Sequence, residues 1–164
     1  MDFVLLAWLF ALAITVHNLE EALLLPDWSK TAGKWHHPVG AGEFRFAVVV
    51  LTLLGYVAAW LATVNGKESV GSYLVAGYAI AMLLNVLFPH AIATVVMRRY
   101  VPGTLTALLL NLPVTLLLLH QGFQEGYIHG ERLAWAGPLV TVSIVAAIPA
   151  LFYLGRRVPV FKEY

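Results

Sequence analysis

Long apolar stretches alternate with short polar connections along the whole chain. Five of these stretches are each long enough to cross a bilayer as a helix, since about 20 apolar residues span its hydrocarbon core. They cover residues 3–25, 43–64, 70–97, 104–121 and 133–155. The connections between them carry the glycine, proline and charged residues that interrupt helices. The pattern predicts an all-α integral membrane bundle of five transmembrane helices, formed by a single domain of residues 1–164.

Composition supports lipid as the solvent of this chain and narrows its partners. Hydrophobic residues make up 60% of the chain and charged residues 12%, and the mean hydropathy is +0.80, whereas soluble domains are about one-quarter charged. The formal net charge of +1 and the lack of a long basic run argue against a nucleic-acid partner. The chain has no cysteine, which excludes disulfides, thiolate catalysis and sulfur-ligated metals. We expect membrane lipid as a partner and no nucleic acid.

The distribution of lysine and arginine predicts an orientation. The connections after the first and third stretches and the C-terminal tail hold Lys30, Lys34, Arg98, Arg99, Arg156, Arg157 and Lys162. The other two connections hold only Lys67 and Arg132. Because basic residues favour the cytoplasmic face, we expect a cytoplasmic C-terminus and an outside N-terminus. The first stretch follows Met1-Asp2 without a basic region, so we interpret it as a retained span and not a signal peptide. The expected location is the cell membrane, with several passes.

Three ionisable residues, His17, Glu20 and Glu21, lie together in the first stretch. A charged side chain at the centre of a bilayer costs about 2.5 to 3.5 kcal/mol, so such residues usually face the protein interior and mark a functional site. At about 100° per residue, Glu20 lies roughly 60° to one side of His17 around the helix, and Glu21 lies roughly 40° to the other side. The three side chains therefore share one face and could share a ligand or a proton.

Depth in the membrane connects this cluster to residues on other helices. His17, His90 and Asn111 each lie seven or eight residues from the expected cytoplasmic end of their stretch, which is about 10 to 12 Å for a rise of 1.5 Å per residue. One polar layer is therefore predicted to gather His17, Glu20, Glu21, Glu43, Asn85, His90 and Asn111. Arg45, one turn or less from Glu43, lies at the edge of this layer. Pro89 is expected to interrupt the helix at Phe88 and open the turn at His90.

Two imidazoles with two or three carboxylates suit one divalent metal, with zinc first and iron or manganese as the other choices. We assign the residues of the layer to three roles. The predicted metal ligands are His17, Glu21 and His90. The predicted catalytic groups are Glu20, Glu21 and Asn111. The predicted substrate contacts are Glu43, Arg45 and Asn85. His36 and His37, in the longest connection, are interpreted as solvated residues or as part of a lid over this site.

The segment His17-Asn18-Leu19-Glu20-Glu21 resembles the defining signature of the HXXEE family, membrane proteins of uncharacterised function. The resemblance extends to Glu43–Phe46, to Asn85 with His90, and to Arg99–Gly103, about two-thirds of the chain. It implies a shared membrane fold and site and names no reaction. The Glu-Glu pair is also similar to that of the glutamate-dependent intramembrane proteases. Their arginine four residues after the second glutamate is Leu25 here, so this similarity is chemical only.

Three functions are compatible with these residues. The first is a metal-dependent membrane enzyme, hydrolytic, that acts on a lipid-like or amphipathic substrate. The second is a proton- or cation-coupled transporter of a small solute, in which the buried glutamates titrate. The third is a non-catalytic assembly or sensor subunit, in which the polar cluster joins helices through hydrogen bonds. A homo-oligomer is compatible with each of them.

Overall fold

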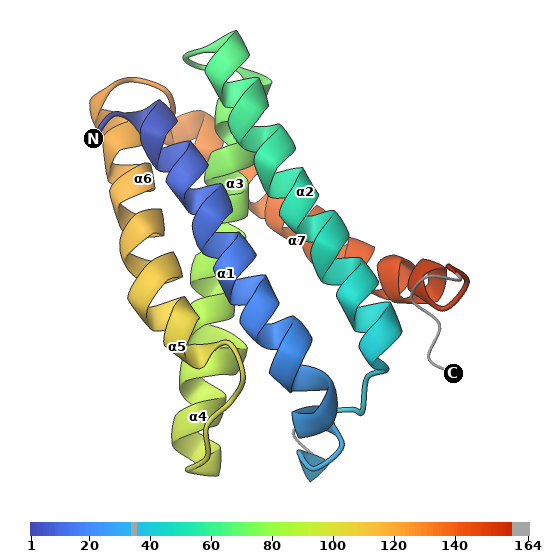
Figure 1. Ribbon diagram of the computed structural model, residues 1–164. Helices are drawn as coiled ribbons and strands as arrows, with labels where there is room; N and C mark the ends of the chain where they lie inside the picture. The colour runs from blue at the N-terminus through green and yellow to red at the C-terminus, as the bar shows by residue number, and fades with distance from the viewer. Residues whose placement is uncertain (34–35, 159–164) are drawn as a thin grey trace.

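The computed structural model describes residues 1–33 and 36–158, and these residues form an all-α bundle (Figure 1). Within them, five helical segments are long and apolar enough to cross a membrane. In chain order they are α1 Phe3–Ser29, α2 Ala41–Asn65, the third span Val70–Met97, the fourth span Thr104–Gln124 and α7 Gly130–Gly155. The five predicted stretches are confirmed, and the apolar helices indicate a multi-pass membrane protein. The orientation of the termini stays a prediction. Two of the basic residues on which it depends, Lys34 and Lys162, lie outside the described residues.

The third span is interrupted close to the middle of the predicted polar layer. It begins as α3 Val70–Asn85, continues as the π-helical segment η2 Val86–Ala91 and ends as α4 Ile92–Met97. Phe88 has an extended backbone, with φ −135° and ψ 122°, and the Phe88–Pro89 peptide bond is cis. The predicted interruption at Phe88 is confirmed, since proline lacks an N–H group and disfavours helix at the preceding residue.

The fourth span also contains a π-helical segment, without an extended residue. It consists of α5 Thr104–Thr106, the π-helical segment η3 Ala107–Asn111 and α6 Leu112–Gln124. The segments η2 and η3 pack against each other. They carry His90 and Asn111, both fully buried. Short π-helical segments within longer helices are frequent at functional sites, and here they face one another in the interior of the bundle.

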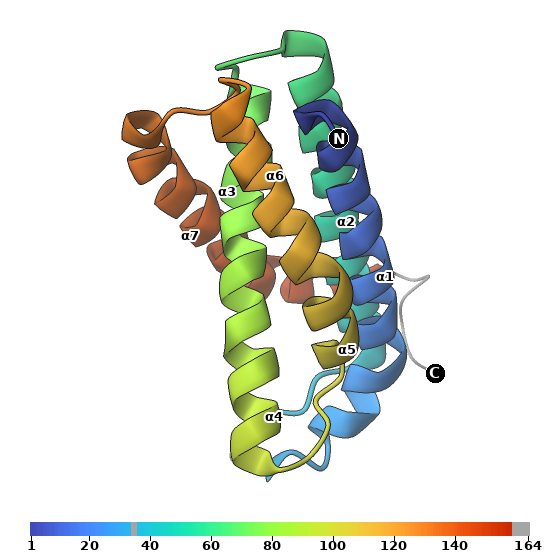
Figure 2. The same cartoon turned by 90° about the vertical axis from the view of Figure 1, so that its left-hand side faces the viewer.

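Packing divides the bundle into an apolar half and a half that contains polar side chains. Helix α1 packs between α2 and α6, and α3 packs against α2, α6 and α7. Figure 2 shows α7 crossing the bundle obliquely. The half near the N-terminus is filled by a large apolar cluster that includes Phe3, Phe10, Ile14 and Leu118. His17 lies one turn beyond Ile14, where this apolar filling ends.

Candidate metal centre

The structure brings His17, Glu21 and His90 together in the interior of the bundle. His17 Nε2 lies 3.8 Å from Glu21 Oε2, and His90 Nε2 lies 3.3 Å from Glu21 Oε1. The two imidazole rings meet edge to face with 4.9 Å between their centroids. One ligand atom from each residue can be chosen so that all lie within 4.8 Å of one another. This cluster, here called the His–Glu–His triad, could hold a metal ion.

Hydrogen bonding identifies which nitrogen of His17 carries the proton. His17 Nδ1 lies 3.0 Å from Thr106 Oγ1. The single hydroxyl hydrogen of Thr106 goes to Glu20 Oε2 at 2.7 Å or to Gly103 O at 3.1 Å, and neither of these oxygens has a hydrogen to give. His17 Nδ1 must therefore be the donor to Thr106, and this assignment follows from the network. In neutral His17 the Nε2 lone pair then faces the triad.

The Nε2 lone pair of His17 makes the triad suited to a cation, with the Asn85 side chain as a further neighbour of the imidazole. The Nε2 lone pair and the Glu21 carboxylate are both acceptors, and they lie 3.8 Å apart. His90 Nε2 is close to Glu21 Oε1 but is not aligned for a hydrogen bond, and within the described chain neither nitrogen of His90 has a hydrogen-bond partner. Buried polar atoms normally have a partner. A divalent ion between the three side chains would satisfy His17 Nε2, His90 Nε2 and the Glu21 carboxylate at once, one atom from each residue.

Glu20, the neighbour of Glu21, faces a different part of the structure. Its carboxylate accepts hydrogen bonds from Gly103 N at 2.9 Å, from Thr106 N at 3.3 Å, from Thr106 Oγ1 and from the Tyr100 hydroxyl. The amide donors lie at the start of α5, where the unpaired N–H groups of a helix favour a negative charge. The catalytic role of Glu20 stays a prediction. Its contacts support a positioning role, because both of its oxygens are used to tie α1 to the fourth span.

Tyr100 lies in the connection between the third and fourth spans and is bound to the Glu20 carboxylate. Its hydroxyl donates to Glu20 and accepts from Leu105 N at 3.3 Å. Partial burial, and next the bond to Glu20, raise the pKa of the Tyr100 phenol above its ordinary value. The phenol is therefore held in its neutral, donating form.

Gly103 brings this connection into contact with the triad. Its φ is +90°, a backbone conformation that favours glycine. A Cβ atom at this position would lie 2.5 Å from His90 Cε1, 2.9 Å from His17 Cε1 and 3.0 Å from Glu21 Cγ. Only a residue without a side chain allows the backbone to approach all three groups so closely. The turn therefore acts as one wall of the candidate metal centre.

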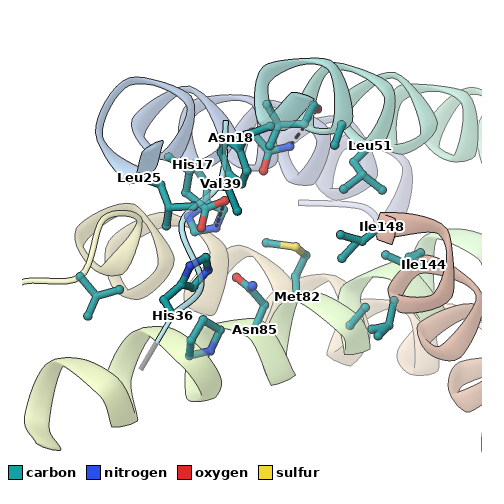
Figure 3. A pocket seen from close by; sticks show the side chains of 18 of the residues that line it. His17, Asn18, Leu25, His36, Val39, Leu51, Met82, Asn85, Ile144 and Ile148 are labelled. Atoms are coloured by element: carbon teal, nitrogen blue, oxygen red, sulfur yellow. Dashed lines mark hydrogen bonds and ion pairs between the residues drawn. The ribbon is translucent and has the colours of Figure 1, made fainter. Parts of the chain in front are cut away.

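A cavity of about 340 Å³ adjoins the triad. Its lining is mostly apolar, and its polar part includes His17, Asn18, Glu21 and Asn85. Figure 3 shows Asn85 and Met82 pointing from the third span into the space that His17 borders from the opposite side. Asn18 is held in place by hydrogen bonds to Val48 O and Thr52 Oγ1. Pockets of this size and character are typical of small-molecule sites.

The sequence of this chain is similar to that of known proteins. A model of the family described as "Protein of unknown function with HXXEE motif" matches residues 8–118 of this chain. The chain belongs to the HXXEE family. It is also 42% identical over 149 residues to "Uncharacterized protein YrkK" of Bacillus subtilis (strain 168), covering 91% of this chain and 94% of that protein. No solved structure matches the chain.

The structure shows what each residue of the HXXEE motif contacts. His17 and Glu21, one helical turn apart, face His90. Glu20 faces the Tyr100–Thr106 segment instead. The motif therefore supplies two members of the triad and one carboxylate that holds the surrounding turn.

Other residues of the predicted layer have different surroundings. Asn85 lines the cavity, and its Oδ1 is buried without a hydrogen-bond partner in the described chain. Asn111 is fully buried on η3, and neither polar atom of its side chain has a partner among the described residues. Asn111 is not among the residues that line the cavity. Its catalytic role, and the substrate contact of Asn85, stay predictions.

Glu43 and Arg45 form contacts outside the cavity. Glu43 pairs with Arg156 at the end of α7, with Arg156 Nη2 3.2 Å from Glu43 Oε1, and it accepts from Gly40 N at 3.2 Å. Arg45 Nε donates to Ala22 O at 3.3 Å. Neither residue lines the cavity, and their predicted substrate contacts stay predictions. His36 does line the cavity, and its ring meets Trp28 at a centroid distance of 5.9 Å.

Sequence reasoning assigned no role in the site to Gly103 or Thr106, although Gly103 lies in the Arg99–Gly103 segment that resembles the family pattern. The segment Pro102-Gly103-Thr104 reads only as a turn before a helix, and this signal does not reveal contacts with histidines on two other helices. Thr106 is a common residue type for an apolar helix, where its hydroxyl usually bonds the backbone. Its contact with His17 joins residues 89 positions apart, which local pattern cannot reveal.

Proposed function

We propose that this HXXEE protein is a metal-dependent membrane enzyme that hydrolyses a lipid-like or amphipathic substrate. His17, Glu21 and His90 would hold one divalent ion, with zinc first and iron or manganese as the other choices. The observation that carries the proposal is the junction of the triad with a mostly apolar cavity. Two histidines and one glutamate are the protein ligands of several catalytic zinc sites, in which the fourth position is open to water or substrate.

The chain's own residues prepare such a site. A bound divalent ion would lower the pKa of a coordinated water to about 7, which makes hydrolysis feasible beside lipid. Thr106 keeps His17 in the tautomer that ligates through Nε2, and Glu20 orients Thr106. Partners of this kind commonly change metal affinity or activity by about 10- to 100-fold. Asn85, which lines the cavity beside His17, would contact a polar group of the substrate.

The same geometry argues against the two alternative functions, a carrier and an assembly subunit. A carrier needs access to its site from both sides of the membrane, whereas the space beyond His17 is filled by buried Phe10, Ile14 and Leu118. An assembly subunit needs a polar cluster whose groups satisfy one another, whereas both nitrogens of His90 lack hydrogen-bond partners in the described chain. These two observations support an enzyme with a site that opens through its apolar cavity.

Hydrolysis of long-chain p-nitrophenyl esters by the purified protein in lipid nanodiscs tests the proposal. We expect activity that is lost on chelation, restored by zinc and absent in Glu21→Gln. Glu131→Gln, an exposed glutamate at the start of α7, serves as the matched control and should retain activity. Ester hydrolysis unaffected by chelation, or equal activity in the two variants, would contradict the metal-dependent reaction. A loaded metal without hydrolysis of any ester would contradict the hydrolytic assignment.

A further inference from the structure

A second cavity adjoins the one beside the triad. It also has a volume of about 340 Å³ and lies between α2, α3 and α7. The two cavities share Leu51, Tyr78 and Ile144 in their linings. The Tyr78 hydroxyl donates to Leu51 O at 3.0 Å, so its polar atom is used at the backbone and its ring contributes an apolar surface. We infer that the two adjacent cavities act as one groove, here called the α2–α7 groove.

The far part of the α2–α7 groove opens toward the lipid-facing surface. Leu54 and Val57 on α2 and Leu139 on α7 line the second cavity, and they are 47%, 49% and 58% exposed. Side chains that line a cavity and are also half exposed mark its rim. In a bilayer this rim would meet acyl chains, because all of these residues lie within helices apolar enough to span the membrane. The groove therefore has a lateral opening between α2 and α7.

The opposite end of the groove is polar. There His17 and Glu21 of the triad and the neighbouring Asn85 border the first cavity. An apolar chain gains little by moving from lipid into an apolar groove, since lipid tails are as apolar as leucine side chains. Selective binding must therefore come from the shape of the groove and from this polar end. A ligand with one polar end and one apolar chain matches both features.

We propose that the α2–α7 groove binds a single unbranched acyl chain that ends in a carboxyl or carboxyl ester group. The carbonyl-bearing end lies against the triad and Asn85, and the chain passes Leu51 and Ile144 and leaves between α2 and α7. The placement of the polar end rests on the proposed function. The course of the chain rests on the shape of the groove alone.

Photo-cross-linking of the full-length protein in nanodiscs tests the inference. The probe is a palmitate analogue with a photoreactive diazirine at the end of its chain, and labelled peptides are identified by mass spectrometry. We expect saturable labelling on α2 and α7 around Leu54 and Ala147, reduced by an excess of palmitate or methyl palmitate. Stronger competition by palmitate identifies a free acid as the ligand, and stronger competition by the methyl ester identifies an ester.

Two tryptophan variants on α7 distinguish the groove from general lipid contact. Ala147→Trp places an indole ring in the second cavity, in whose wall Ala147 lies, and should reduce labelling about tenfold because the ring takes the space of the acyl chain. Val142→Trp is the matched control, because Val142 is 64% exposed and does not line either cavity. Ser143→Phe, also in the second cavity, replaces Ala147→Trp if that variant does not fold.

The outcomes separate this inference from the proposed function. Unsaturable labelling spread over all exposed helix faces, or equal labelling of the Ala147 and Val142 variants, would overturn the groove. Metal content is measured in the same samples. If labelling is lost only in the groove variants and metal is absent from all samples, the acyl groove stands and the metal-dependent reaction fails.

Discussion

Replacing Gly103 by alanine would place a methyl group against all three residues of the triad. The backbone at Gly103 has φ +90°, and a non-glycine residue in the left-handed region costs about 1 to 2 kcal/mol. The new Cβ would also lie 2.5 Å from His90 Cε1 and 2.9 Å from His17 Cε1. Both rings are fully buried, so they cannot turn away without moving their neighbours. Overpacking of a buried site typically costs a further 1 to 3 kcal/mol or so.

Gly126→Ala separates the backbone cost from the contact with the triad. Gly126 also has a positive φ, +71°, but a Cβ there would have no atom within 4 Å. We therefore expect Gly126→Ala to destabilise the protein by about 1 to 2 kcal/mol, and Gly103→Ala by about 2 to 5 kcal/mol. Only Gly103→Ala should lower the metal content of the protein, because only it displaces the ligand side chains.

Thermal unfolding in detergent and metal analysis of the same samples measure both effects. Equal destabilisation by the two substitutions, with equal metal content, would refute the close approach of Gly103 to the triad. A stable Gly103→Ala protein that has lost its metal would still support it, because the rings would then have moved to accommodate the methyl group at low cost.

Three further predictions follow from the contacts around Glu20. Thr106→Val removes the hydroxyl beside His17 and should lower zinc affinity by about 10- to 100-fold, measured by competition with a chelating dye. Thr106→Ser keeps the hydroxyl and should keep the affinity. Unchanged affinity in the valine variant would show that Thr106 does not set the tautomer of His17. Glu20→Gln should destabilise the protein by about 1 to 3 kcal/mol because its charged hydrogen bonds are lost. Glu21→Gln should chiefly lower the metal content. The reverse pattern would make Glu20 the metal ligand and Glu21 the positioning residue. The Tyr100 phenol, read as the ultraviolet difference from Tyr100→Phe, should ionise above pH 10 or so, because burial and Glu20 raise its pKa. The contribution of Tyr100 to stability is then complete below the pKa of the unfolded chain and is lost as the pH rises through the pKa of the folded protein. Ionisation at or below the ordinary value would contradict the hydrogen bond to Glu20.

Regular helix geometry explains which features could be predicted from the sequence. Apolar length alone predicts the five helical segments, because crossing the hydrocarbon core requires a minimum number of residues. Counting residues from the helix ends brings His17 and His90 to one depth, and their ring centroids lie 4.9 Å apart. This works because the rise per residue is nearly constant. Pro89 likewise predicts the extended Phe88, since its effect on the helix is local.

Tertiary packing decides the features that the sequence pattern could not reveal. Glu20 and Glu21 are neighbours about 100° apart on α1, and which of them faces His90 depends on where η2 and the Tyr100–Thr106 segment dock. Glu43 pairs with Arg156, 113 residues away, because the oblique course of α7 brings its end to the start of α2. Depth counting does not include such lateral positions, which is why it placed Glu43 at the edge of the polar layer without revealing its pairing with Arg156.

Metal analysis of the protein purified without chelators decides whether the His–Glu–His triad holds an ion. We expect about one divalent ion per chain in the wild-type protein, the same content in the exposed control Glu131→Gln, and loss of the ion in Glu21→Gln. A folded wild-type protein that contains no metal and takes up neither zinc, iron nor manganese would contradict the proposed metal centre. So would a Glu21→Gln variant that retains the full metal content.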